Sequence, residues 1–333
     1  MNKRLDVCNL HVKFHTQGGI FHAVRGINFS LFEGETLGIV GESGCGKSAA
    51  AKALIQLNPL SNTELFGEVL YQGENLLNFS EKKMQTIRGK EIGMIFQDPM
   101  TSLNPTIKVG RQIMEGLFRH FPKTSYSQAR RIAIETLKRV GISSPEERFD
   151  AYPHTLSGGM RQRIMIALGL ICKPNILIAD EPTTALDVTI QAQILDLLKE
   201  IQQTRMSIIL ITHDMSVIAS ICDRVIVMYA GKIIESASVE QLFSSPQHPY
   251  TQRLLSAIPR LDQPKENPLI PIEGTPPNLS LPLQGCGFCL RCPDAMRICA
   301  KEQPPFYEAA PSHFSACYKH DSRYLGLKND PSS

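Results

Sequence analysis

The chain has 333 residues, of which 42% are apolar, enough for one large domain with an appendage or for two domains. Its 35 basic and 32 acidic residues nearly balance, so the net charge of +3 gives no electrostatic argument for nucleic-acid binding. The start, MNKRLDVCNL, lacks the apolar core of a secretory signal. The longest apolar run, at 164–172, is half of the roughly 18 to 20 residues needed to span a bilayer, so we expect a cytosolic chain.

Short apolar runs alternate with helical patterns along the chain, which is typical of an α/β fold with a mostly parallel sheet. Strands are predicted at 35–40, 92–96, 175–179 and 207–211, and a helix from about Lys47. Helical spacing is carried between the last two strands by Ile190, Ile194, Leu197, Leu198 and Ile201, and earlier by Ala129, Ile132, Ala133, Leu137 and Val140. The interval from about 109 to 154 contains no strand pattern, which predicts a helical insertion.

The segment GESGCGKS at 41–48 follows the first of these strands and opens the first helix. It matches G-x-x-x-x-G-K-[ST], a loop whose backbone N–H groups surround phosphate oxygens. Lys47 supplies a positive charge and Ser48 a hydroxyl for Mg²⁺. This loop predicts a binding site for a nucleoside triphosphate.

Polar side chains follow the other predicted strands, at the sheet edge where open parallel sheets bind ligands. Gln97 can orient a water molecule or contact the metal, and Asp180 can hold a metal-bound water. Glu181 can accept a proton from the attacking water, and His213 follows the fourth strand. Together these residues predict phosphoryl hydrolysis.

A second Ser-Gly-Gly helix start, in HTLSGGMRQR at 154–163, raises the question of why one chain carries two phosphate-binding segments. It lies beyond the helical insertion, too far to reach the nucleotide of its own subunit. We therefore predict that it contacts the nucleotide of a second subunit, so that two ATP molecules lie between two chains packed head-to-tail. Hydrolysis would then reopen the dimer.

The set GESGCGKS, Gln97, LSGGMRQR, ILIADEP, Ala185-Leu186-Asp187 and His213 resembles the ATP-binding subunits of ABC transporters over about residues 4–245. The resemblance implies a P-loop NTPase fold of ABC type, with an antiparallel β subdomain and a helical subdomain, and ATPase activity. It implies that ATP is contacted by Gly41, Ser43, Gly44, Cys45, Gly46, Lys47, Ser48 and Ala49. Mg²⁺ would be served by Ser48, Gln97 and Asp180.

The resemblance also assigns the remaining site residues. Glu181 is the general base and His213 the switch residue, while Ser157, Gly158 and Gly159 contact the partner's γ-phosphate and Asp187 lies at the dimer seam. An aromatic side chain before the P-loop stacks on adenine in this family. Phe14 is the candidate and Phe21 the alternative, because the loop HTQGGI leaves the register open.

Two further segments, QDPMTSLNP at 97–105 and QHPYTQRLLSAIP at 247–259, resemble the peptide-importer branch. The resemblance implies import of dipeptides or oligopeptides at the cytoplasmic face of a bacterial inner membrane. The partners would be two transmembrane permeases, an extracytoplasmic peptide-binding protein and a second ATP-binding subunit, in a heterodimer. Nickel or glutathione import is an alternative, and a soluble ABC ATPase acting on nucleic acid or ribosomes is another, though one P-loop and little net charge disfavour it.

The end of the chain is rich first in proline and then in cysteine. We predict an ATP-binding domain at 1–258, with its helical subdomain at about 98–160, then a proline-rich linker at 259–285 and a cysteine-rich extension at 286–333. Such a cysteine cluster in a reducing compartment favours metal over disulfides.

The extension resembles that of oligopeptide and dipeptide importer ATPases. In some members a [4Fe–4S] cluster is held at the positions of Cys286, Cys292, Cys299 and Cys317, with Cys289 as a possible substitute ligand here. Zn²⁺ and a metal-free tail remain alternatives. Cys8, Cys172 and Cys222 are expected in the core, and Cys45 as a small side chain of the P-loop.

Overall fold

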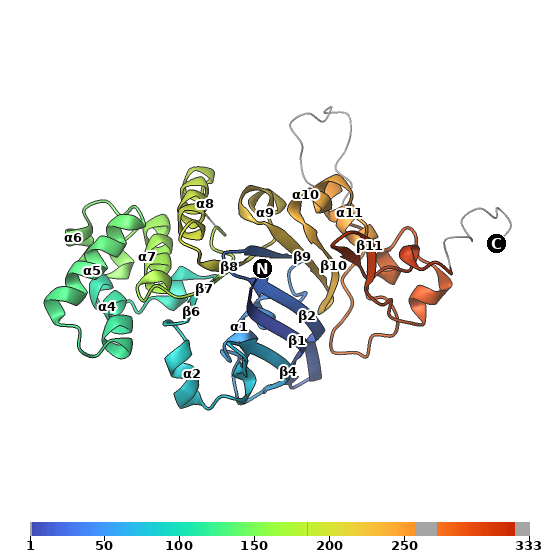
Figure 1. Ribbon diagram of the computed structural model, residues 1–333, viewed down its shortest axis with the longest axis horizontal. Helices are drawn as coiled ribbons and strands as arrows, with labels where there is room; N and C mark the ends of the chain where they lie inside the picture. The colour runs from blue at the N-terminus through green and yellow to red at the C-terminus, as the bar shows by residue number, and fades with distance from the viewer. Residues whose placement is uncertain (1, 185, 258–271, 324–333) are drawn as a thin grey trace.

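The computed structural model describes residues 2–184, 186–257 and 272–323. A helical region and a C-terminal region flank a central part that contains two β-sheets (Figure 1). Of the predicted segments, Ala185, residues 259–271 of the proline-rich linker and the last ten residues lie outside the described ranges.

The larger sheet has eight strands in the spatial order β11-β12-β10-β9-β3-β8-β7-β6. The five strands from β9 to β6 run parallel, and the three beyond β9 run antiparallel to their neighbours. Their bounds are β3 (Thr36–Val40), β6 (Ile92–Ile95), β7 (Ile176–Asp180), β8 (Ser207–Thr212), β9 (Arg224–Tyr229), β10 (Lys232–Ser238), β11 (Tyr307–Ala310) and β12 (His313–Ser315). The four strands predicted from apolar runs are confirmed as β3, β6, β7 and β8.

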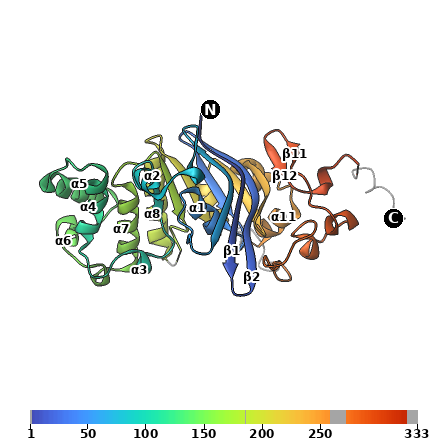
Figure 2. The same ribbon diagram turned by 90° about the horizontal axis from the view of Figure 1, so that it is seen from below.

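The smaller sheet is antiparallel, in the order β2-β1-β4-β5. It consists of β1 (Lys3–Thr16), β2 (Gly19–Phe32), β4 (Thr63–Tyr71) and β5 (Glu74–Asn75). Strands β1 and β2 form a long hairpin (Figure 2). Thr16 pairs with Gly19 at its turn, which fixes the register that the sequence left open.

Helices cover both faces of the large sheet, and alternate residues of its strands divide between two cores. Leu177 and Leu210 pack with α8 and α9, whereas Ile178 and Ile211 pack with α1 and the smaller sheet. This division follows from the two-residue period of a strand. The helices are α1 (Lys47–Leu54), α2 (Glu81–Ile87), α8 (Val188–Gln202), α9 (Met215–Ile221), α10 (Val239–Ser244) and α11 (Pro249–Ser256).

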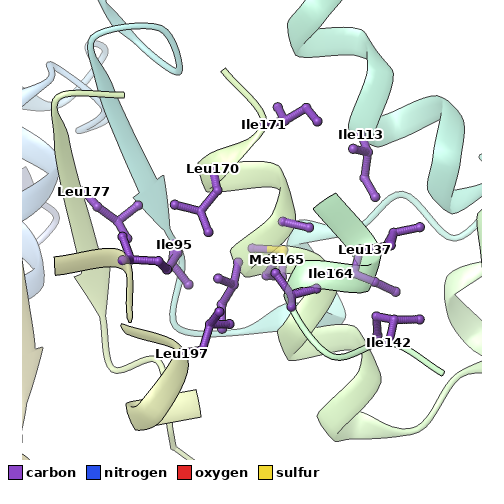
Figure 3. Packing of buried hydrophobic residues seen from close by; sticks show 14 of the residues in the cluster. Ile95, Ile113, Leu137, Ile142, Ile164, Met165, Leu170, Ile171, Leu177 and Leu197 are labelled. Carbon is purple, nitrogen blue, oxygen red and sulfur yellow. The ribbon is translucent and has the colours of Figure 1, made fainter. Parts of the chain in front are cut away.

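The helical region contains α3 (Pro99–Ser102), α4 (Val109–His120), α5 (Tyr126–Arg139), α6 (Pro145–Phe149) and α7 (Gly158–Leu170). Its core is continuous with that of the sheet. Figure 3 shows Ile164 and Met165 of α7 between Ile113 and Leu137 on one side and Leu197 on the other. The α7 helix is therefore held by both regions, which fixes the position of its N-terminus.

The C-terminal region is attached to the large sheet. Strand β12 pairs with β10 through Glu235 and Ser315, and β11 pairs with β12. Short 3₁₀ turns complete the described chain at η1 (Leu76–Asn78), η2 (Pro153–Thr155), η3 (Cys289–Arg291), η4 (Arg297–Ala300) and η5 (Tyr318–His320). Within the described ranges, no helix combines the length and the apolar character required to cross a bilayer.

Candidate functional site

The loop at 41–48 joins the buried strand β3 to α1. Gly46 has φ 104° and caps α1, and Gly44 has φ 81°, a region that glycine reaches without strain. A Cβ atom on Gly46 would lie 2.3 Å from the Ala23 carbonyl oxygen, and one on Gly41 would lie 2.2 Å from that of Met228. The glycines are therefore required by close packing of the loop against neighbouring backbone.

Lys47 is buried inside this loop. Its Nζ donates to the carbonyl oxygens of Gly41 at 2.7 Å and Glu42 at 3.1 Å. Two carbonyl oxygens thus hold the ammonium group inside the loop, at the N-terminus of α1, where backbone N–H groups would bind an anion.

Ser48 and Asp180 meet at the edge of the sheet. The Ser48 hydroxyl donates to Asp180 Oδ1 at 2.9 Å, and Asp180 is 2% exposed. Burial raises the pKa of the Asp180 carboxyl, which the Ser48 hydrogen bond partly offsets. A hydroxyl and a buried carboxylate are the oxygen ligands that Mg²⁺ accepts, so these residues fit the ion.

Glu181 is contacted by three side chains, one from its own turn and two that follow β6 and β8. Its Oε2 accepts from Gln97 Nε2 and from Thr184 Oγ1, both at 2.9 Å, and its Oε1 lies 3.4 Å from His213 Nδ1. Glu181 has φ 49°, in the left-handed region that is costly for a non-glycine residue. The carboxylate is therefore fixed beside Asp180. Thr184 was missed from the sequence, where it is one hydroxyl in a turn without other signal.

A cavity of about 310 Å³ brings most of the predicted nucleotide residues together. Phe14 and Phe21 pair across β1 and β2, and both line this cavity. It is further lined by Ala23, Ser43, Gly44, Gly46, Lys47, Ser48, Ala49, Gln97 and Glu181. The rings of Phe14 and Phe21, the loop that carries Lys47 and the carboxylate of Glu181 thus line the same cavity.

The Ser-Gly-Gly segment lies elsewhere. Ser157 caps α7, its Oγ accepting from Met160 N–H at 3.3 Å, and Gly158 is exposed with open space around its Cα. Asp187 caps α8, its Oδ1 accepting from Ile190 N–H at 2.9 Å. A Cβ atom on Gly159 would lie 3.2 Å from Ile190 Cγ2, so the two helix starts are neighbours. None of these residues lines the cavity described above.

The cysteines of the C-terminal region lie near one another. Burial, with the neighbouring thiols Cys299, Cys317 and Cys292, raises the pKa of Cys286 to about 12. Burial raises the pKa of Cys292 to about 11. Residues 2–184, 186–257 and 272–323 nevertheless contain no group of three or more His, Cys, Asp or Glu side chains that could hold a metal ion. The predicted iron–sulfur or zinc site is therefore not formed in this structure.

The other cysteines are free thiols. Cys172 and Cys45 are buried, and Cys222 packs against the core. The prediction of a core position is wrong for Cys8, which is half-buried in β1 and pairs with Glu68 of β4 at the strand surface.

Two family models match the chain. The model described as ABC transporter matches residues 24–184, and the one described as Oligopeptide/dipeptide transporter, C-terminal region matches residues 234–299. The first spans the P-loop, the Ser-Gly-Gly segment and Glu181, and the second begins in β10 and ends at Cys299.

Curated relatives match over nearly the whole chain. The dipeptide transport ATP-binding protein DppD of Bacillus subtilis is 53% identical, over 97% of this chain and 96% of that protein. The oligopeptide transport ATP-binding protein OppD of Bacillus subtilis is 52% identical, over 94% and 88%, and that of Escherichia coli is 48% identical, over 95% and 93%. These relatives do not favour the nickel, glutathione or nucleic-acid alternatives.

Solved structures share the fold. A dimeric structure of the ATP-binding cassette MJ0796, in a post-hydrolysis state bound to ADP and Pi, is 27% identical with a TM-score of 0.64, over 71% of this chain and 98% of that one. The structure of cbiO1 from Clostridium perfringens is 30% identical with a TM-score of 0.61, over 74% and 92%. The predicted ABC-type P-loop fold is confirmed, and the chain is an ABC-type ATPase that belongs to the family of oligopeptide and dipeptide transport ATP-binding proteins.

Proposed function

We propose that this chain hydrolyses ATP to energise the import of dipeptides or oligopeptides through partner permeases. The observation that carries the hydrolytic part is the fixed carboxylate of Glu181, which lies with Lys47 and Ser48 around one cavity. The peptide cargo is supported by the curated relatives, which are named for dipeptide and oligopeptide transport.

We propose the following roles, which the family resemblance implies and the geometry supports. The backbone of residues 41–48 and the Lys47 ammonium bind the phosphates, and Phe14 or Phe21 stacks on adenine. Ser48 and Asp180, with Gln97, hold Mg²⁺, which neutralises phosphate charge when bound. Glu181 accepts a proton from the attacking water at its Oε1 or Oε2, and Gln97, Thr184 and His213 keep that carboxylate in place.

The exposed Ser-Gly-Gly segment is the proposed contact to a second ATP-binding subunit. Ser157, Gly158 and Gly159 offer backbone N–H groups at the start of α7, and Asp187 lies at the adjoining start of α8. The dimeric state of the MJ0796 cassette supports pairing. We propose a heterodimer, as the family resemblance implies, with ATP binding closing the pair and hydrolysis reopening it.

A groove between α2 and the helical region is the proposed docking surface for a permease. It has a volume of about 1100 Å³ and contains the exposed rings of Phe118 and Tyr126, with the cations of Lys82, Arg111 and Arg119 and the ion pair of Lys108 with Asp150. Apolar rings with flanking cations suit an amphipathic helix that carries acidic residues. Docking here would place the chain at the cytoplasmic face of the membrane, with an extracytoplasmic peptide-binding protein on the other side.

The domain limits are part of the same proposal: an ATP-binding domain at 1–258 with a helical subdomain at about 98–160, a linker at 259–285 and a C-terminal extension at 286–333. We propose that Cys286, Cys292, Cys299 and Cys317 of the extension bind a [4Fe–4S] cluster, with Cys289 as substitute and Zn²⁺ as the alternative. This part of the proposal rests on the family resemblance of the extension alone, because the described residues form no metal site. Iron and sulfide in anaerobically purified protein test it, and one zinc per colourless chain identifies the alternative.

Purification of the tagged chain from membranes tests the transport function. Permeases and a peptide-binding protein are expected to copurify, and peptide is expected to raise ATP turnover in the reconstituted assembly. Phe118→Asp is expected to release the permeases while leaving ATP binding intact. Copurification of nucleic acid in place of permeases would overturn the proposal.

A further inference from the structure

We propose that Arg291 of the C-terminal region is a positioning residue for the phosphate-binding loop and acts through Glu42. The C-terminal region then sets the ATP affinity of the site. This inference rests on the nucleotide site proposed above, but it concerns a residue more than two hundred positions away in the sequence.

Arg291 joins three segments through its guanidinium group. Nη1 donates to Glu42 Oε2 at 2.7 Å and Nη2 to Glu42 Oε1 at 3.0 Å, a bidentate ion pair. The remaining bonds go from Nη1 to the Tyr229 hydroxyl at 3.0 Å, from Nη2 to the Ile272 carbonyl at 3.1 Å and from Nε to the Glu273 carbonyl at 2.9 Å. These five bonds use the five N–H donors of an arginine, which no other side chain could match.

Glu42 is the second residue of the loop, and its backbone is also held. Its N–H donates to the Tyr250 hydroxyl at 2.9 Å, and its carbonyl oxygen accepts from Lys47 Nζ at 3.1 Å and from Cys45 N–H at 3.2 Å. Arg291 therefore fixes the side chain of Glu42, and Tyr250 fixes its backbone. Because the Glu42 carbonyl oxygen accepts from Lys47, these contacts also restrain the lysine that would bind phosphate.

The charge of Glu42 gives Arg291 a second effect. The carboxylate lies on a loop that would bind a polyanion, where an uncompensated negative charge would oppose ATP. Arg291 neutralises it with a side chain that is 6% exposed. Hydrogen bonding to Glu42 raises the pKa of the Arg291 guanidinium, a group that is already ionised in proteins without such a shift.

A cluster of three aromatic side chains, Tyr229, Tyr250 and Phe288, packs beside Arg291. Phe288 is 1% exposed and packs edge-on against Tyr229 and Tyr250, at ring centroid distances of 5.3 and 5.4 Å. A Cβ atom on Gly287 would lie 3.1 Å from Ala230 Cβ, so the backbone approaches β9 closely before η3 begins. Arg291 is thus presented to the loop by packed structure and not by a free tail.

The test is ATP binding and hydrolysis by Arg291→Ala. We expect the ATP dissociation constant and the KM to rise about tenfold, because the phosphate-binding loop loses a restraint and the Glu42 carboxylate loses its counter-charge. We expect kcat to stay within about twofold of the wild-type value, because the contacts of Glu181 do not change. Arg291→Lys keeps the charge but not the bidentate bonds, so an increase of about threefold is expected. The control is Arg297→Ala, an exposed arginine of the same region, for which no change is expected.

A second substitution shows whether the effect passes through Glu42. Added to Arg291→Ala, Glu42→Gln removes the uncompensated carboxylate and is expected to recover ATP affinity about threefold. If the two substitutions instead weaken binding independently, the inference is wrong. The inference is also wrong if KM of Arg291→Ala stays at the wild-type value and its apparent kcat falls only because a smaller fraction of the protein is folded.

Two further variants keep the test decisive. If Arg291→Ala does not fold, Arg291→Lys carries the test, and unchanged ATP affinity in that variant overturns the inference. Lys47→Ala separates this inference from the site itself. Undiminished ATP binding by Lys47→Ala refutes the proposed nucleotide site, whereas loss of binding there with none in the Arg291 variants refutes only the role of Arg291.

Discussion

Gln97 and Glu181 are joined by a 2.9 Å hydrogen bond from Nε2 to Oε2, although 84 positions separate them in the chain. Gln97 follows β6 and Glu181 follows β7, and these neighbouring parallel strands end at the same edge of the sheet. The bond therefore links the start of the helical region to the residue proposed to activate water. A movement of that region on permease docking would reach Glu181 through one side chain.

Glu181→Gln is expected to keep ATP binding and to lower the hydrolysis rate at least about a hundredfold, because the amide cannot accept the proton. Phosphate release and mant-ATP binding measure the two effects. The variant should also accumulate as closed dimers with ATP. Wild-type phosphate release from this variant would remove Glu181 as the base.

Gly158→Asp is expected to abolish ATP-dependent association with the partner subunit while leaving ATP binding by the chain's own P-loop unchanged. The new carboxylate would face the partner's γ-phosphate and repel it. Size-exclusion chromatography with ATP, in the Glu181→Gln background, measures association. Gly158→Ala is the matched control, since a Cβ atom there meets nothing within 4 Å. Equal association of both variants would contradict the proposed dimer.

Phe14→Ala is expected to weaken ATP binding about tenfold through loss of stacking, and to leave binding of inorganic triphosphate unchanged. Phe21→Ala is the comparison, because Phe21 lines the same cavity from β2. A larger loss in Phe21→Ala would move the adenine contact to that ring. Equal weakening of triphosphate binding would show damage to the phosphate loop instead.

Asp180→Asn is expected to abolish Mg²⁺-dependent hydrolysis and to raise the melting temperature of the nucleotide-free protein by a few degrees at pH 7. Burial raises the pKa of this carboxyl, so its ionised form destabilises the fold at pH 7. The cost disappears as the pH falls and Asp180 takes up a proton, so the difference from wild type should shrink in acid. Thermal unfolding between pH 7 and pH 4 measures it, and an unchanged difference would contradict the argument.

His248 is expected to make the protein acid-sensitive. Its Nδ1 accepts from the Tyr250 N–H at 3.0 Å, and burial lowers its pKa from 6.5 to about 4. The unfolded chain therefore binds a proton between these values that the folded chain does not, and stability is lost as the pH falls through this window. His248→Asn keeps a capping acceptor without titrating, so its melting temperature should fall less over the same range. Parallel curves for the two proteins would refute this.

Some residues of the site could be predicted from the sequence and others could not. The loop at 41–48 and the polar residues after the buried strands were predictable, because their chemistry is local and their strands are continuous apolar runs. Thr184 was not, since a hydroxyl in a turn carries no periodic signal. Arg291 was not either, because its partner lies across a contact that only tertiary packing defines. The pairing of β12 with β10 was not predictable for a different reason, because the three residues of β12 form too short a pattern to indicate a strand.

The pairing of β12 with β10 forms late during synthesis of the chain. Strand β10 is synthesised some eighty residues before β12, so its outer edge has no partner while the ribosome adds the intervening chain. An unpaired strand edge is a template for pairing with another molecule. Glu235 of β10 and His313 of β12 are both buried, and Glu235 Oε1 lies 2.7 Å from His313 Nε2. This contact can form only after β12 has been synthesised. A chain interrupted before residue 313 would therefore leave β10 exposed and prone to aggregate, even with every nucleotide-binding residue already in place.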